Sequence, residues 1–180
     1  MKLSKFSEKF SDVMIAEGIY FQDERGSLKK TMYSSKLLDI MGNISEVLCS
    51  TSSKDVIRGM HFQNKPKEIS KFITCTEGRI LDVFLDVRKD SKTFGEFDSI
   101  LLSASDDKAI FIPEGFAHGY GVLSNKASIV YLQSGDYSEE HDFSIHPLSI
   151  GIDWEVSIPK LSEKDISAVT FDQYVSTLTN

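Results

Sequence analysis

The sequence predicts a mainly β protein: an antiparallel β-sandwich or barrel with a few short helices. Between Ile44 and Gln133, short segments of strand-like composition are separated by turn-forming groups such as Glu77-Gly78 and Pro113-Glu114-Gly115. The segments are regularly spaced, and almost no helical periodicity lies between them. Closely spaced strands without intervening helices pair antiparallel, which is typical of sandwiches and barrels.

The expected elements follow one another along the chain. Val13–Phe21 is predicted to form a first strand, closed by a turn at 22–26. Ser34–Met41 has apolar residues at helical spacing and is followed by Gly42, a helix stop. Further strands are expected at 56–63, 71–75, 79–88, 96–102, 109–112, 117–123 and 128–133. Leu161–Asp165 predicts a late helix start with Ser162 as its N-cap.

Composition limits the classes of function. The chain has 180 residues, enough for one domain, predicted over 1–180, with a substantial core. Its 20 basic and 27 acidic residues give a net charge of −7, which disfavours binding to nucleic acid or to a membrane surface. No stretch has the composition of a signal peptide or a membrane span, so a cytoplasmic location is expected. Cys49 and Cys75 are expected to be reduced, buried thiols.

The stretch Val56–Gln63 combines strand-like alternation with a fixed cation and an imidazole. Arg58 and His61 are three residues apart, so on a regular strand they would point to opposite faces. Gly59 lies between them, and a glycine inside a strand often marks a bulge or bend. A bend at Gly59 would bring both side chains into one cavity.

His61 and His118 are the candidate imidazoles, because each is expected on a strand that can face the mouth of a jelly roll. A pair of hydrogen-bonded core histidines is an equally good interpretation. His61, His118 and Glu68 would make only a weak metal-ligand set, because Phe62 and Gln63 replace the second histidine of the His-x-His pair typical of metal-binding barrels.

Five further candidates each have an ordinary structural explanation. Tyr131 lies within a strand, where a tyrosine is commonly a core residue with its hydroxyl hydrogen-bonded. Lys71 begins a strand after a polar loop and is ordinarily solvated. Arg25 and Arg58 each lie beside a glycine, where surface or turn ion pairs are common. Asp165 is suited to a helix N-terminus, where its charge meets the helix dipole.

A set of motifs in fixed order carries a resemblance over nearly the whole chain. The motifs are Arg58–Gln63, Lys71–Ile73, Gly78–Arg88, Ser91–Gly95, Ile112–Gly119 and Gly151–Trp154, with the turn Asp23–Gly26 and the tail Leu161–Asp165. Together they resemble the dTDP-4-dehydrorhamnose 3,5-epimerase family. The resemblance implies a cupin-type jelly roll, a homodimer, a nucleotide-diphosphate sugar as substrate, and no metal or organic cofactor.

The resemblance also implies a chemistry for specific residues. A proton beside the ketone of a 4-keto-6-deoxy sugar is removed from one face and returned to the other, which needs a base, an acid and a cation for the enolate oxygen. His61 matches the base, Asp165 its carboxylate partner, Tyr131 the acid and Lys71 the enolate stabiliser. Arg25 and Arg58 match positions that hold the nucleotide, His118 matches a position that contacts the sugar, and Tyr137 matches a tyrosine that stacks on the base. Asp142 and Lys164 fall at further binding positions of the family.

Two segments depart from the family pattern. After Arg25-Gly26 the family has aromatic residues and a glutamate, whereas this chain has Ser27–Lys30. Glu46–Leu48 replaces a Gln-x-Asn segment. Both regions belong to substrate recognition, so a CDP- or GDP-linked sugar, or epimerisation at C3 or C5 alone, is an alternative hypothesis. A non-catalytic sugar-nucleotide binding protein and a metal-dependent cupin are alternatives from other classes.

Overall fold

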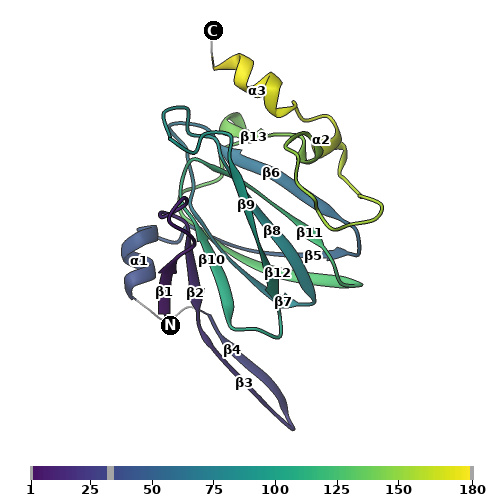
Figure 1. Ribbon diagram of the computed structural model, residues 1–180. Coiled ribbons are helices and arrows are strands. Elements are labelled where there is room, and N and C mark those ends of the chain that lie inside the picture. The colour runs from purple at the N-terminus through teal and green to yellow at the C-terminus, as the bar shows by residue number, and fades with distance from the viewer. Residues whose placement is uncertain (1, 32–34, 179–180) are drawn as a thin grey trace.

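The protein is seen in a computed structural model that describes residues 2–31 and 35–178. Its described strands form a six-stranded sheet, a five-stranded sheet and a separate two-stranded ribbon, and all named strand pairs are antiparallel. The two large sheets face each other in Figure 1. The prediction of a mainly β, antiparallel sandwich is confirmed.

The six-stranded sheet has the order β1-β2-β10-β7-β12-β5, the five-stranded sheet the order β13-β6-β11-β8-β9, and the ribbon pairs β3 with β4. The strands are β1 (Lys2–Lys5), β2 (Met14–Glu17), β3 (Ile19–Asp23), β4 (Gly26–Lys30), β5 (Glu46–Ser53), β6 (Ile57–Gln63), β7 (Lys71–Glu77), β8 (Arg79–Asp86), β9 (Phe97–Ser103), β10 (Lys108–Ile112), β11 (Phe116–Val122), β12 (Lys126–Gln133) and β13 (Asp142–Ser144). The helices are α1 (Ser35–Met41), α2 (Glu163–Ile166) and α3 (Phe171–Thr177), with 3₁₀ turns at Glu139–His141 and Pro147–Ser149.

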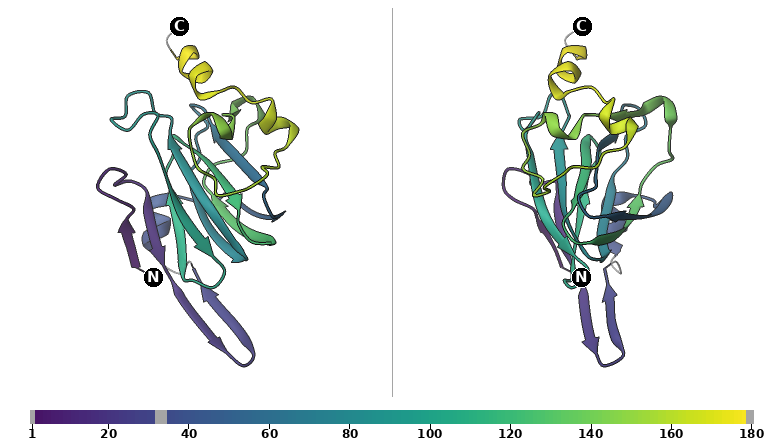
Figure 2. Two further views of the ribbon diagram at one scale, coloured as in Figure 1. Left: turned by 45° about the vertical axis from the view of Figure 1, so that its right-hand side comes forward. Right: turned by 90° about the vertical axis from the view of Figure 1, so that its right-hand side faces the viewer.

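The main core lies between the inward faces of the two sheets. Ile73 and Ile129 of the six-stranded sheet are buried against Phe84 and Val122 of the five-stranded sheet. Both sheets are also covered outside: α1 places Leu37 over the six-stranded sheet, and the C-terminal segment packs over the five-stranded sheet. The outer position of α2 and α3 is visible in Figures 1 and 2. The C-terminal segment is thereby held beside β6, which matters for the site described below.

The β3–β4 ribbon projects away from the sandwich, beyond the end of β2 (Figure 2). Its strands pair with each other from Ile19 with Lys30 to Asp23 with Gly26. At its tip Asp23 accepts hydrogen bonds from the backbone N–H and the guanidinium of Arg25. Apolar side chains are left in solvent on this ribbon, including Phe21 at 62% and Leu28 at 64% exposure.

Most predicted elements are present, with several corrections. Val13–Phe21 is two strands, because the chain breaks at Gly18 between β2 and β3. The helix expected at 34–41 is α1, while Ser34 itself lies outside the described residues. Strands β1, β4, β5 and β13 and helix α3 were not predicted. Cys75 is buried as expected, but the prediction for Cys49 is wrong: it is exposed, because it lies on the face of β5 opposite to the inward-facing Ser50 and Ser52.

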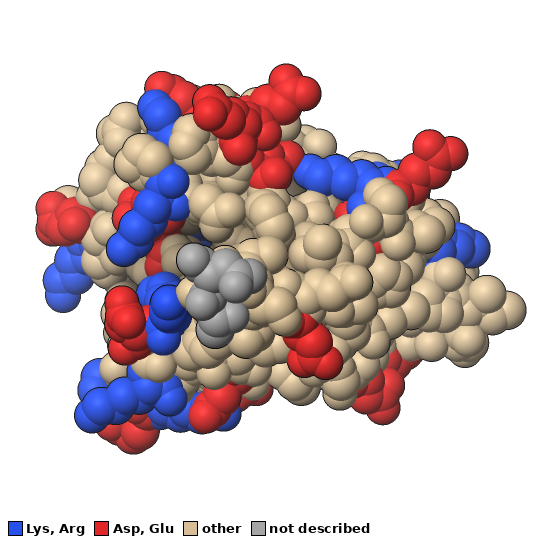
Figure 3. Space-filling view, turned by 90° about the horizontal axis from the view of Figure 1, so that it is seen from above, with Lys and Arg blue, Asp and Glu red and all other residues tan. Residues whose placement is uncertain are grey.

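Charge is distributed in small groups. In the view from above, acidic and basic side chains are interspersed among the described residues of that face (Figure 3). This pattern agrees with a surface of mixed sign and a small net negative charge rather than with a broad basic face. Among the described residues, no helix has both the length and the apolar character needed to cross a bilayer.

Candidate active site

A cavity of about 330 Å³ opens between the two sheets, with walls from β6 and β11 on one side and from β5, β7 and β12 on the other. The loop after β12 and the start of β13 form part of its rim. The cavity brings together eight of the ten residues selected from the sequence: Arg58, His61, Lys71, His118, Tyr131, Tyr137, Asp142 and Lys164. Asp165 lies directly behind His61, and Arg25 lies elsewhere.

The bend predicted in β6 is confirmed. Against β11, His61 pairs with His118 and Arg58 pairs with Tyr120, so three steps along β6 match two along β11. Gly59 provides the extra residue, with φ at 138°, a conformation that side chains with a Cβ rarely adopt. The bulge turns Arg58 and His61 toward the same cavity.

His61 forms a short hydrogen bond with Asp165, with 2.6 Å between Nε2 and Oδ1. The His61 side chain is 34% exposed, whereas that of Asp165 is 2% exposed. Burial raises the pKa of Asp165, but hydrogen bonds and charge from His61, together with a bond involving Ser162, hold that pKa below its usual value. Asp165 is therefore an anion that fixes the imidazole and stabilises its protonated form.

Asp165 serves both predicted purposes through different atoms. Its backbone N–H is part of the helix N-cap, and its carboxylate is the partner of His61. Ser162 caps α2 by accepting a hydrogen bond from the backbone N–H of Asp165 at 3.1 Å. The Asp165 carboxylate contacts His61 through Oδ1. A capped turn of helix thus holds the carboxylate against β6, 104 residues away along the chain.

Lys71 and Tyr131 face the cavity from the six-stranded sheet. Burial lowers the pKa of Lys71 to about 8, while the charges of Asp142 and Asp82 oppose that shift. The Lys71 Nζ donates to the backbone carbonyl of His61 at 2.9 Å, which ties the two walls together. Burial raises the pKa of Tyr131 well above its usual value, so its hydroxyl stays protonated at neutral pH.

His118 has its own carboxylate partner, which sequence reasoning missed. Its Nε2 lies 2.8 Å from Oδ2 of Asp82, and both side chains are buried. Burial lowers the pKa of His118, although Asp82 opposes this. The His118 ring also packs edge-on against Tyr131 at 5.7 Å between centroids. The signal was a charged residue at an inward position of the apolar strand β8, between Ile80 and Phe84.

A chain of polar contacts joins the rim of the cavity. The Tyr137 hydroxyl donates to Asp142 at 3.2 Å, and Lys164 donates to the same Asp142 oxygen at 2.5 Å. Glu46, in the segment that departs from the family pattern, accepts from the Tyr137 backbone N–H and from the side-chain amide of Gln133. Tyr137 remains 60% exposed, so its side chain is accessible to a ligand.

One expectation is not met within this chain. Arg25 is at the tip of the ribbon, 85% exposed and paired with Asp23, and does not line the cavity. His61, His118 and Glu68 do not form a metal-ligand group, since the described residues contain no cluster of three suitable side chains. A larger hollow, of about 950 Å³, lies beyond Phe62 and Gln63. None of the described histidines lines that hollow, so the smaller cavity is the candidate site.

Comparisons with known proteins agree with this geometry. The model of the dTDP-4-dehydrorhamnose 3,5-epimerase family matches residues 7–173. The dTDP-4-dehydrorhamnose 3,5-epimerase of Shigella flexneri is 39% identical over 165 residues, covering 89% of this chain and 91% of that protein. The dTDP-4-dehydrorhamnose 3-epimerase of Streptomyces niveus is 31% identical and covers 82% of this chain and 73% of its own length.

Solved structures give the same result. The dTDP-6-deoxy-D-glucose-3,5-epimerase of Legionella pneumophila, crystallised with dTDP-4-keto-L-rhamnose, superposes with a TM-score of 0.88 at 30% identity. That superposition covers 98% of this chain and 96% of the other. The sandwich is therefore a cupin-type jelly roll, and the chain is an isomerase that belongs to the dTDP-4-dehydrorhamnose 3,5-epimerase family.

Proposed function

We propose that this protein epimerises a dTDP-linked 4-keto-6-deoxy sugar at C3, C5 or both, by proton transfer through an enolate. The observation that carries the proposal is that His61, which is hydrogen-bonded to Asp165, and Tyr131 line one cavity from opposite sheets, and that Lys71 lines the same cavity. An inversion needs a base and an acid on different faces of one carbon. The dTDP-sugars in the names of the relatives support the nucleotide.

His61 takes the proton in the proposed reaction. With Nε2–H donated to the ionised Asp165, Nδ1 carries the lone pair that can accept a proton from carbon. The C–H electrons move into the C–C bond, and the C4 carbonyl becomes an enolate oxygen. Lys71 stabilises that oxygen, because an ammonium with a pKa of about 8 is largely charged at pH 7 and only one of its protons is held by the His61 carbonyl.

Tyr131 completes the inversion by donating its phenolic proton to the opposite face of the carbon, which restores the ketone. The resulting phenolate recovers a proton from solvent, and the His61 imidazolium loses one to solvent, so the cycle closes without an oxidant or reductant. A hydroxyl held fully protonated by burial is suited to this role, because it cannot act as a competing base at rest.

The remaining predicted residues suit the nucleotide and sugar. Arg58, whose Nε is held by Ser52 at 2.9 Å, has guanidinium protons left for phosphate oxygens. His118 lines the cavity and is assigned to the sugar, and the exposed Tyr137 side chain suits stacking on the base. The ion pair between Asp142 and Lys164 lines the same cavity.

A homodimer would explain the position of Arg25. In one copy Arg25 does not line the cavity, and Phe21 and Leu28 are exposed. The ribbon that carries these residues extends away from the sandwich (Figure 1). Two-stranded ribbons are marginally stable in water unless packed on another surface. We propose that the ribbon packs on a second copy and supplies Arg25 to the phosphates in that copy's cavity.

The experiment is proton NMR in heavy water with the 4-keto-6-deoxy sugar on dTDP, then on CDP and GDP. We expect deuterium at C3, C5 or both, fastest with dTDP, and a dimer in analytical ultracentrifugation. Exchange at one carbon would assign a mono-epimerase, as in the Streptomyces niveus relative. Faster turnover of a CDP- or GDP-sugar would refute the choice of nucleotide. Binding without exchange in any of the three would support a sugar-nucleotide binding protein without turnover.

A further inference from the structure

The β3–β4 ribbon is exposed along its outer length except at one side chain. From Phe21 to Lys30, every residue but Lys29 is exposed, and the Lys29 side chain is 12% exposed. Across the ribbon Lys29 pairs with Tyr20, whereas Leu28 pairs with Phe21. Successive side chains of a strand point to opposite faces, so with Lys29 turned to the sandwich, the Leu28–Phe21 pair must face away.

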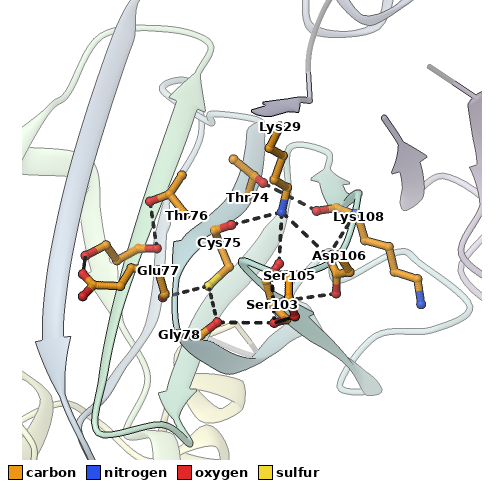
Figure 4. A network of polar contacts seen from close by, with 11 residues as sticks. Lys29, Thr74, Cys75, Thr76, Glu77, Gly78, Ser103, Ser105, Asp106 and Lys108 are labelled. Carbon is orange, nitrogen blue, oxygen red and sulfur yellow. Dashed lines mark hydrogen bonds and ion pairs between the residues drawn. The ribbon is translucent and has the colours of Figure 1, made fainter. Parts of the chain in front are cut away.

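Lys29 reaches acceptors on both sheets, as Figure 4 shows. Its Nζ donates to the backbone carbonyls of Cys75 and Ser103, each at 3.0 Å, and lies 3.7 Å from Oδ1 of Asp106. Cys75 belongs to β7 of the six-stranded sheet and Ser103 ends β9 of the five-stranded sheet. One ammonium therefore joins the ribbon to both layers of the sandwich.

The acceptors are arranged by the sandwich itself. Asp106 is fixed by accepting from the backbone N–H of Ser103 at 3.2 Å and of Lys108 at 3.0 Å. The single proton of the Cys75 thiol is shared between the carbonyls of Glu77, the last residue of β7, and Gly78, at 3.2 and 3.4 Å. Because these contacts do not involve Lys29, the ribbon docks its lysine onto a group of acceptors that is already in place (Figure 4).

We propose that Lys29 is a positioning residue that sets the direction and the exposed face of the ribbon, and so aims Arg25 and the Phe21–Leu28 face at the cavity of a second copy. The inference rests on the proposed dimer. It explains why a lysine whose side chain is only 12% exposed lies within the otherwise exposed segment 21–30. Lys29 touches neither substrate nor cavity, so its effect on the reaction passes through Arg25.

The first test is hydrogen exchange on the full-length protein. Lys29→Met is expected to speed amide exchange in β3 and β4 by roughly tenfold while leaving β7 and β9 protected. Lys126→Met is the matched control, because it removes an exposed lysine paired with Glu77 at the end of the sandwich. Lys29→Arg keeps the charge and is expected to restore much of the protection. Unchanged ribbon exchange in Lys29→Met would overturn the inference, whatever the substrate proves to be.

The second test is a double-mutant cycle on KM for the dTDP-linked 4-keto sugar. Lys29→Met and Arg25→Ala are each expected to raise KM about tenfold, the loss expected for one charged contact to phosphate, with kcat changed less. In the Arg25→Ala background, Lys29→Met should add almost nothing. If the KM increases of the two single variants multiply in the double variant, the inference is overturned. A monomeric wild-type protein would also overturn it. A dimer without turnover would refute the proposed function alone, since the exchange test still decides the role of Lys29.

Discussion

Replacing Asp165 with Asn is expected to lower kcat by about 30-fold while leaving the fold intact. The change removes the charge from the 2.6 Å contact with His61 but keeps the size of a side chain that is 2% exposed. A hydrogen bond to a charged partner contributes about 1.5–3 kcal/mol. Because His61 is about one-third exposed, solvent screens part of this, and about 2 kcal/mol, or roughly 30-fold in rate, is expected.

The assay is the initial rate of deuterium uptake at saturating substrate, with the urea midpoint measured in parallel. The backbone N–H of Asp165 that Ser162 caps is unaffected by the substitution, so α2 should still form. Asp153→Asn is the control, because Asp153 is exposed and holds only a local turn; its rate should stay within about twofold of wild type. A folded Asp165→Asn variant with the wild-type rate would refute the assignment of Asp165 as the partner of the base.

Three further predictions address the acid, the enolate stabiliser and the bend in β6. Tyr131→Phe should reduce formation of the epimer by at least about 100-fold while deuterium uptake persists, because removal and return of the proton can still occur on one face; equal loss of both would contradict the role of Tyr131. Activity should fall as pH rises through about 8, where Lys71 loses its charge, and a Lys71→Met variant should lack that limb of the pH–rate profile. Gly59→Ala should lower the free energy of unfolding in urea by more than about 2 kcal/mol, because the added Cβ would lie 2.5 Å from the backbone of β11. Gly26→Ala is the control: Gly26 has a similar φ but open space around it, so the loss of stability should be clearly smaller. Equal losses in the two variants would refute the argument from crowding.

The sequence predicted best what is encoded in local pattern. Turn-forming residues separate β7 to β12 almost where they were expected, and a glycine between a cation and an imidazole was sufficient to predict the bulge in β6. The same motifs carried a family resemblance that the comparisons confirm. The roles of the individual side chains and the homodimer stay predictions, because they depend on substrate and on a second copy.

The features that local pattern did not predict, strand β5 and the role of Asp82, depend on contacts with residues distant in the sequence. β5 contains Cys49-Ser50-Thr51-Ser52-Ser53, which has no apolar alternation, and it is a strand because it pairs with β12 along its whole length. Its inward face is polar because Ser50 and Ser52 both contact the Tyr120 hydroxyl inside the sandwich, and alternation along the strand puts Cys49 on the exposed outer face. Asp82 was missed for a similar reason, since its partner His118 is 36 residues away.

From residue pattern alone, His61 and His118 were equivalent candidate imidazoles. Their burial in the structure distinguishes the roles that each can take. Each has a carboxylate partner, Asp165 for His61 and Asp82 for His118. His61 is 34% exposed, so a substrate can reach it and water can take up the proton that it has accepted. His118 is 3% exposed, and burial lowers its pKa. A base must exchange protons with solvent in every cycle, whereas a binding group only has to hold one tautomer. The same residue pairing therefore suits proton transfer at His61 and fixed hydrogen bonding at His118.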